Sequence, residues 1–121
     1  MRRALALLGL IALAACNNAA GAAQSTTDSA TKSVYSNDVA GVDSNFDAAL
    51  QAQVNRAQVG ALSDKMHALG DYKGVTYLST DAAKSEFTYR ADFSKGSMNV
   101  VVRVDPDGKL AAYRVFPQSQ P

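Results

Sequence analysis

A two-residue alternation between residues 86 and 104 constrains the fold of this chain more than any other feature. In an extended strand, successive side chains point to opposite faces of the sheet. The apolar residues that fall on one face are Phe87, Tyr89, Ala91, Phe93, Met98, Val100, Val102 and Val104. A hairpin with Lys95-Gly96 in its turn keeps them all on one side, because glycine supplies the positive φ that such a turn needs. The pattern therefore predicts an antiparallel hairpin in which Phe93 faces Met98 and Phe87 faces Val104.

Two further strands are predicted on either side of this hairpin. The stretch DPDG at 105–108 is a turn sequence, with proline and glycine at the positions that such turns favour. A three-residue loop there pairs Val104 with Leu110 and, on the other face, Val101 with Tyr113. The stretch GVTYLS at 74–79 predicts one more strand. The result is a four-stranded antiparallel meander.

Upstream of the strands, apolar residues recur at helical spacing between residues 44 and 69. The apolar stripe turns by about a third of a turn after Gly60, which predicts a helix that is kinked or split near that residue. Gly70 stands where a glycine ends a helix. We therefore expect an α+β domain over residues 43–116, with the helix packed on the meander and a polar tail at 117–121.

The order of these elements carries a family resemblance. The stretch LGDYKGV, followed by FTYRADFSKGSMNVVVRVDPDGKLAAYRV, resembles the C-terminal half of small NTF2-like domains, and a helix followed by a curved meander is similar to the cystatin arrangement. The resemblance implies a sheet face that forms a dimer contact or lines a pocket. The full NTF2-like cone has further N-terminal helices, which we do not expect in this chain.

The first sixteen residues resemble the signal sequence of bacterial lipoproteins. Two arginines precede an apolar run that is too short to span a membrane, and the run ends in Leu13-Ala14-Ala15-Cys16, which matches a lipobox. The resemblance implies cleavage after residue 15 and lipidation of Cys16, which anchors the chain in a membrane. Asn17 stands where lipoproteins retained in the inner membrane often have aspartate, so in a host with that sorting rule the resemblance implies the periplasmic face of the outer membrane. The alternative is an ordinary signal peptide with an incidental cysteine.

Residues 16–42 are predicted to be a flexible tether. Apart from Val34, Tyr35 and Val39, their side chains are small or polar, and too little apolar surface can be buried to repay the entropy of ordering. Once Arg2 and Arg3 are removed, ten basic residues face eleven acidic ones, so nothing suggests a nucleic-acid partner.

No residue pattern suggests catalysis, a metal or a cofactor. His67 is the only histidine, and it is interpreted as a partly exposed structural residue. Asp105 and Asp107 are explained by turn formation. Since Cys16 is the single cysteine, no disulfide can form within the chain.

One face of the last hairpin is a candidate interaction surface, because apolar, tyrosine and arginine side chains are mixed there as they are in protein interfaces. Its expected members are Arg90, Val101, Arg103, Ala111, Tyr113 and Val115. Cover by residues 17–42 or by a second helix is the alternative. The leading hypothesis is a lipid-anchored, non-catalytic protein of the cell envelope that binds itself or another envelope protein. An inhibitor or immunity-type protein acting on an envelope hydrolase through loops 94–97 or 105–108 is the second hypothesis. A small-ligand or enzymatic pocket is the third.

Overall fold

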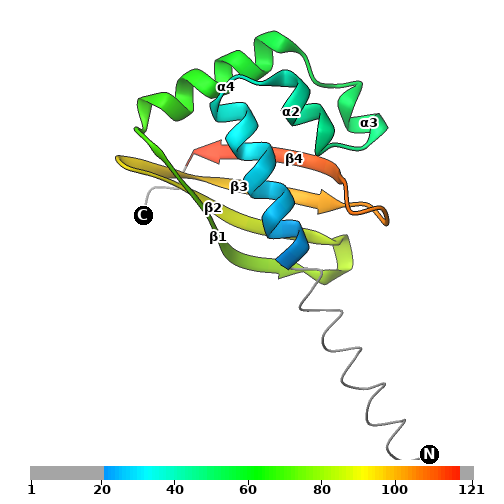
Figure 1. Ribbon diagram of the computed structural model, residues 1–121. Helices are drawn as coiled ribbons and strands as arrows, with labels where there is room; N and C mark the ends of the chain where they lie inside the picture. Colours follow the sequence, from blue (N-terminus) through cyan, green and yellow to red (C-terminus); the bar gives the residue numbers. More distant parts are fainter. Residues whose placement is uncertain (1–20, 118–121) are drawn as a thin grey trace, which may run out of the picture.

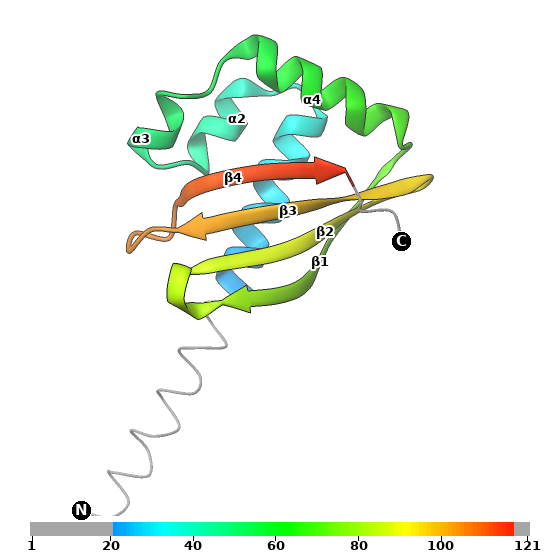
Figure 2. The same ribbon diagram turned by 180° about the vertical axis from the view of Figure 1, so that it is seen from behind.

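The computed structural model describes residues 21–117, which form helices on one face of a four-stranded antiparallel sheet with strand order β1-β2-β3-β4 (Figures 1 and 2). The elements in chain order are a helix over residues 21–35, α2 (Val39–Ser44), α3 (Ala48–Gln51), α4 (Arg56–Ala68), β1 (Tyr72–Asp81), the short 3-10 helix η1 (Ala82–Lys84), β2 (Glu86–Phe93), β3 (Gly96–Val104) and β4 (Leu110–Pro117). The predicted α+β class, with helices ahead of a meander, is confirmed.

The expectation of a flexible tether over residues 16–42 is wrong from residue 21 onward. Residues 21–35 form a helix that crosses the sheet (Figure 1). Its buried residues follow helical spacing, and they are Ala23, Thr27, Ala30, Thr31 and Val34. Four of the five are alanine or threonine, whose small side chains give little hydrophobic signal in the sequence. The expectation that the chain has no further N-terminal helix is also wrong, because residues 21–35 form one.

The predicted helix over 44–69 is broken, but not at Gly60, which lies inside α4. The breaks fall at residues 45–47 and 52–55. Each of the three short helices begins at a side chain that accepts a hydrogen bond from the helix backbone: Asp38 caps α2, Asp47 caps α3 and Asn55 caps α4. Closely spaced capping residues therefore divide this segment. The predicted stop is confirmed, because Gly70 has φ +94° directly after α4.

The β2–β3 hairpin has the predicted faces but not the predicted register. Phe93 pairs with Gly96 and Ala91 pairs with Met98, so the turn residues are Ser94 and Lys95. The register differs by two residues from the expected one, and a shift of two leaves every side chain on its original face. The predicted core residues of the hairpin are confirmed for that reason, since Tyr89, Ala91, Val100 and Val102 are fully buried.

The β3–β4 pairing contains a bulge near the start of β4, and it changes the predicted pairing. Val104 pairs with Leu110 as predicted, but Arg103 already pairs with Ala112, so Ala111 is the extra residue. Beyond the bulge Val102 pairs with Tyr113 and Val100 with Val115, in place of the predicted pairing of Val101 with Tyr113. The bulge reverses the faces of all β4 residues after it.

Two tyrosine hydroxyls tie the N-terminal helix to the sheet. The hydroxyl of Tyr113 lies 2.8 Å from Thr31 Oγ1, and that of Tyr72 donates to Asp28 Oδ1 at 2.6 Å. Burial raises the pKa of both phenols above the usual value, and the contact with Asp28 adds to the shift at Tyr72. Both phenols are neutral at physiological pH, so the contacts between helix and sheet persist there.

The packing of the N-terminal helix predicts a large difference between two alanine substitutions in that helix. Ala30 is fully buried and Ala22 is exposed. We expect Ala30→Glu to lower the free energy of unfolding by about 3 kcal/mol or more, because it buries an unpaired charge. Ala22→Glu is the matched control and should change it by less than about 0.5 kcal/mol. Urea denaturation followed by circular dichroism measures both, and equal small effects would contradict the packed helix.

Candidate interaction surface

The face of the sheet opposite the helices is the candidate site, and we call it the outer face. No helix within residues 21–117 packs on it (Figure 2). Alternation along the strands places its members on all four strands. They are Gly74, Thr76, Ser79, Asp81, Glu86, Thr88, Arg90, Asp92, Ser97, Asn99, Val101, Arg103, Ala112, Arg114 and Phe116.

Three of the six residues predicted for this surface lie on the outer face, and three do not. Arg90, Val101 and Arg103 lie on the outer face. Tyr113 and Val115 were assigned to it wrongly, because they follow the bulge and pair with core residues on β3. Ala111 occupies the bulge itself. Tyr113 packs against Phe46 on the helix side, with ring centroids 5.5 Å apart, so it contributes to the core.

Two residues that the sequence analysis missed give the outer face its exposed character. Phe116 is 44% exposed, and the guanidinium of Arg114 lies 6.0 Å from the centre of its ring. The sequence LAAYRVFP contains an indication of these two positions. Leu110 and Tyr113 are both large residues typical of a core, but they are three positions apart, whereas residues on one face of a regular strand are an even number of positions apart. Two residues with an odd separation can both face the core only if a bulge lies between them.

Ion pairs leave one arginine of the outer face unpaired. Arg90 Nε lies 2.6 Å from Asp92 Oδ1, and Arg114 Nη2 lies 3.1 Å from Glu86 Oε2. Burial disfavours the charged form of Asp92, but hydrogen bonds from Thr76 and Arg90 outweigh it and lower the pKa of this carboxyl group. Arg103 is exposed and makes no ion pair within residues 21–117. Arg103 is thus the one arginine of the face without an ion pair in this part of the chain, and it lies four residues along β3 from Asn99, the register partner of Phe116.

The other features singled out in the sequence have structural roles. His67 is exposed and packs edge-on against Tyr35, with ring centroids 4.0 Å apart. Asp105 Oδ1 accepts hydrogen bonds from the backbone of Asp107 and Lys109, each at 2.9 Å, which stabilises the turn. Cys16 lies outside the described residues, so the structure places neither the lipobox nor the signal sequence.

The turn between β2 and β3 is held by the end of α4. Ser94 N donates to Asp71 O at 2.9 Å, and Lys95 N donates to Leu69 O at 2.7 Å. A Cβ atom at Gly70 would collide with Ser94, so glycine is required at that point for space as well as for its φ angle. Loop 94–97 is thus part of the scaffold, whereas loop 105–108 projects beyond the sheet (Figure 1).

An apolar hollow of about 270 Å³ lies on the helix side of the sheet, between α2, α3, α4 and Tyr113. Phe46, Leu50 and Val59 are among its lining residues, and no charged side chain lines it. Such a lining can hold an apolar group but supplies no acid–base pair. Among residues 21–117 there is no cluster of three metal-ligating side chains of the His, Cys, Asp and Glu types. None of the helices in this part of the chain is both long and apolar enough to cross a bilayer.

The chain was compared with known protein families, with curated proteins and with solved structures, and none of the three comparisons found a match. The class of protein is therefore defined by its own fold and surface: a small α+β domain with one helix-covered and one uncovered sheet face.

Asn99 gives a test of whether the outer face is built for stability. It lies between Arg90 and Phe116 in register, and its Oδ1 is buried without a hydrogen-bond partner. We expect Asn99→Val to raise the free energy of unfolding by about 1 kcal/mol, because it removes an unsatisfied polar atom and favours the strand. Urea denaturation measures the change, with Thr88→Val on the neighbouring strand as control. A loss of stability in Asn99→Val alone would mean that the amide is satisfied.

Proposed function

We propose that this protein is a lipid-anchored, non-catalytic binding protein of the bacterial cell envelope, and that its outer face takes a protein partner. The observation that carries the proposal is the uncovered sheet face, which presents Phe116 at one end, Val101 in the middle and Arg103, which has no ion-pair partner within residues 21–117, at the other end. Aromatic and arginine side chains are the residues that dominate binding energy in protein interfaces. The lipobox at Cys16 supports the membrane anchor.

The chemistry of the outer face restricts the partner. An exposed phenyl ring favours an apolar contact, and unpaired Arg103 favours a carboxylate that can bind it in a bidentate way. Eight-residue strands in a four-stranded sheet cover about 500 Å². That area lies below the roughly 800 Å² per partner of a standard stable interface, so we expect a transient complex. A second copy of this chain is one candidate, and another envelope protein is the other.

The binding proposal predicts the effect of charge on the outer face. We expect Val101→Asp combined with Phe116→Asp to abolish association while the circular dichroism spectrum is unchanged, since both side chains point away from the core. Gln58→Asp, on an exposed position of α4, is the control that should leave association intact. Light scattering over a range of concentrations detects a homodimer.

If the protein is a monomer, a photo-cross-linking residue at position 116 in living cells should give an adduct with one protein that is absent when the residue is at position 58. A monomer that forms no such specific adduct would contradict a binding role for the outer face.

The proposed anchor predicts that Cys16→Ser moves the protein from the membrane fraction to the soluble fraction of a lipoprotein-processing bacterium. Diacylation together with an N-acyl chain holds a protein firmly, whereas the unmodified chain has no such anchor. Asn18→Ser is the matched control and should stay with membranes. Intact mass measurement of the mature chain should show the added lipid on Cys16. An unmodified mass with normal membrane release would leave an ordinary signal peptide as the explanation.

A further inference from the structure

The start of the N-terminal helix and strand β1 lie together at one edge of the sheet. Gln24 Nε2 donates to Val75 O at 3.1 Å, and Gly21 and Gln24 line a shallow groove together with residues 73–75. Both ribbon views place the beginning of the helix beside β1, at the edge opposite β4 (Figures 1 and 2). The chain therefore enters the described domain at the β1 edge.

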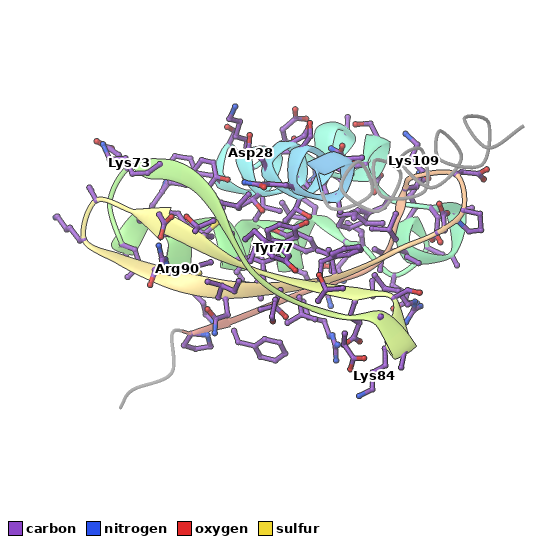
Figure 3. The ribbon with its side chains drawn as sticks, turned by 90° about the horizontal axis from the view of Figure 1, so that it is seen from below. Asp28, Lys73, Tyr77, Lys84, Arg90 and Lys109 are labelled. Atoms are coloured by element: carbon purple, nitrogen blue, oxygen red, sulfur yellow. The ribbon has the colours of Figure 1, made fainter. Side chains whose placement is uncertain are left out.

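This edge carries two exposed large apolar side chains. Tyr77 is 44% exposed and Leu78 is 43% exposed, and they are adjacent on β1 at the point where the pairing with β2 is irregular. Tyr77 lies near the middle of this edge when the molecule is viewed from below (Figure 3). Its ring packs edge-on against Tyr89, with centroids 5.9 Å apart, and its hydroxyl bonds Thr80. A half-exposed tyrosine, which joins an apolar ring to a polar hydroxyl, suits the boundary between water and lipid.

The charges at the β1 edge are compatible with a lipid surface. Lys73 and Lys84 lie toward opposite ends of the edge (Figure 3), and both are exposed. Asp81 is the one acidic residue of β1, and Asp28 on the helix is paired with Lys32 at 3.5 Å. Each lysine near an anionic membrane contributes about 1 kcal/mol of attraction. The edge therefore repels neither neutral nor anionic headgroups.

The length of chain between the proposed anchor and the domain restricts which side of the domain can meet the membrane. Only residues 17–20 separate Cys16 from Gly21, so the two Cα atoms can be at most about 18 Å apart. A domain of the described size has a diameter of about 30 Å. The connection is shorter than the domain is wide, so Gly21 stays within about 18 Å of the bilayer, and orientations that put the β1 edge on the far side of the domain are excluded.

We propose that the β1 edge is a membrane-docking surface, in which Tyr77 and Leu78 insert at the headgroup boundary while Cys16 holds the chain in the bilayer. This inference rests on the proposed lipid anchor and names the surface that the anchor presents to lipid. It places the outer face at a steep angle to the membrane, where a protein partner can reach it. The occupant of the β1 edge is thus lipid, and the occupant of the outer face is protein.

The sequence supplies the tools for a direct test. Cys16 is the only cysteine and the chain has no tryptophan. The chain over residues 16–121 can therefore be coupled through Cys16 to a maleimide lipid in phosphatidylcholine vesicles containing phosphatidylglycerol, with one tryptophan as the reporter. Tyr77→Trp and Leu78→Trp report on the β1 edge. Phe116→Trp is the matched control, because Phe116 is as exposed as Tyr77 but lies on the opposite edge strand.

Coupling to vesicles should shift the emission of both β1-edge variants to shorter wavelength, and brominated lipids should quench more than half of it. Emission from Phe116→Trp should change little. Protein whose Cys16 is capped before mixing sets the baseline, and circular dichroism verifies that each variant is folded. Equal emission in all three coupled variants, or quenching of Phe116→Trp alone, would overturn the docking surface. Because the coupling is chemical, that outcome is separate from a failure of natural lipidation, which the Cys16→Ser fractionation tests.

Discussion

The fold depends on how closely the N-terminal helix approaches the inner face of the sheet. Ala23, Thr27 and Ala30 present small side chains at this contact, which lets the helix lie close to the buried residues of β2 and β3. Thr31 brings a hydroxyl into the same contact, and both Thr27 O and Tyr113 satisfy it. Since this helix occupies the middle of the sheet, the short helices α2, α3 and α4 are left to cover the part next to β4 (Figure 1). The opposite face of the sheet stays open.

Most of the sheet could be predicted from the sequence, because a period of two fixes which face a residue occupies. The same period cannot distinguish registers that differ by two residues, which is why the core of the hairpin was right although its turn was misplaced. The candidate surface was less predictable. One bulge at Ala111 moved Tyr113 and Val115 into the core and brought Arg114 and Phe116 out. The helix over 21–35 escaped prediction because alanine and threonine carry little hydrophobic signal, although their spacing is helical.

The domain has three distinct surfaces: the helix-covered face of the sheet, the β1 edge and the outer face. The helix-covered face forms the core, which must supply all the stability because Cys16 is the only cysteine. The β1 edge lies where the chain enters from the proposed anchor. The outer face carries the side chains that suit a protein contact, and β1 borders both surfaces.

The bulge at Ala111 has a consequence for how such a protein can evolve. Loss or gain of a single residue at this position exchanges the two faces of β4 beyond it. Side chains that faced the core then face outward, and those that faced outward face the core. Selection for a new contact could therefore act through insertion and deletion as well as through replacement. Relatives that differ in this way would share the fold while their last strands align poorly residue by residue.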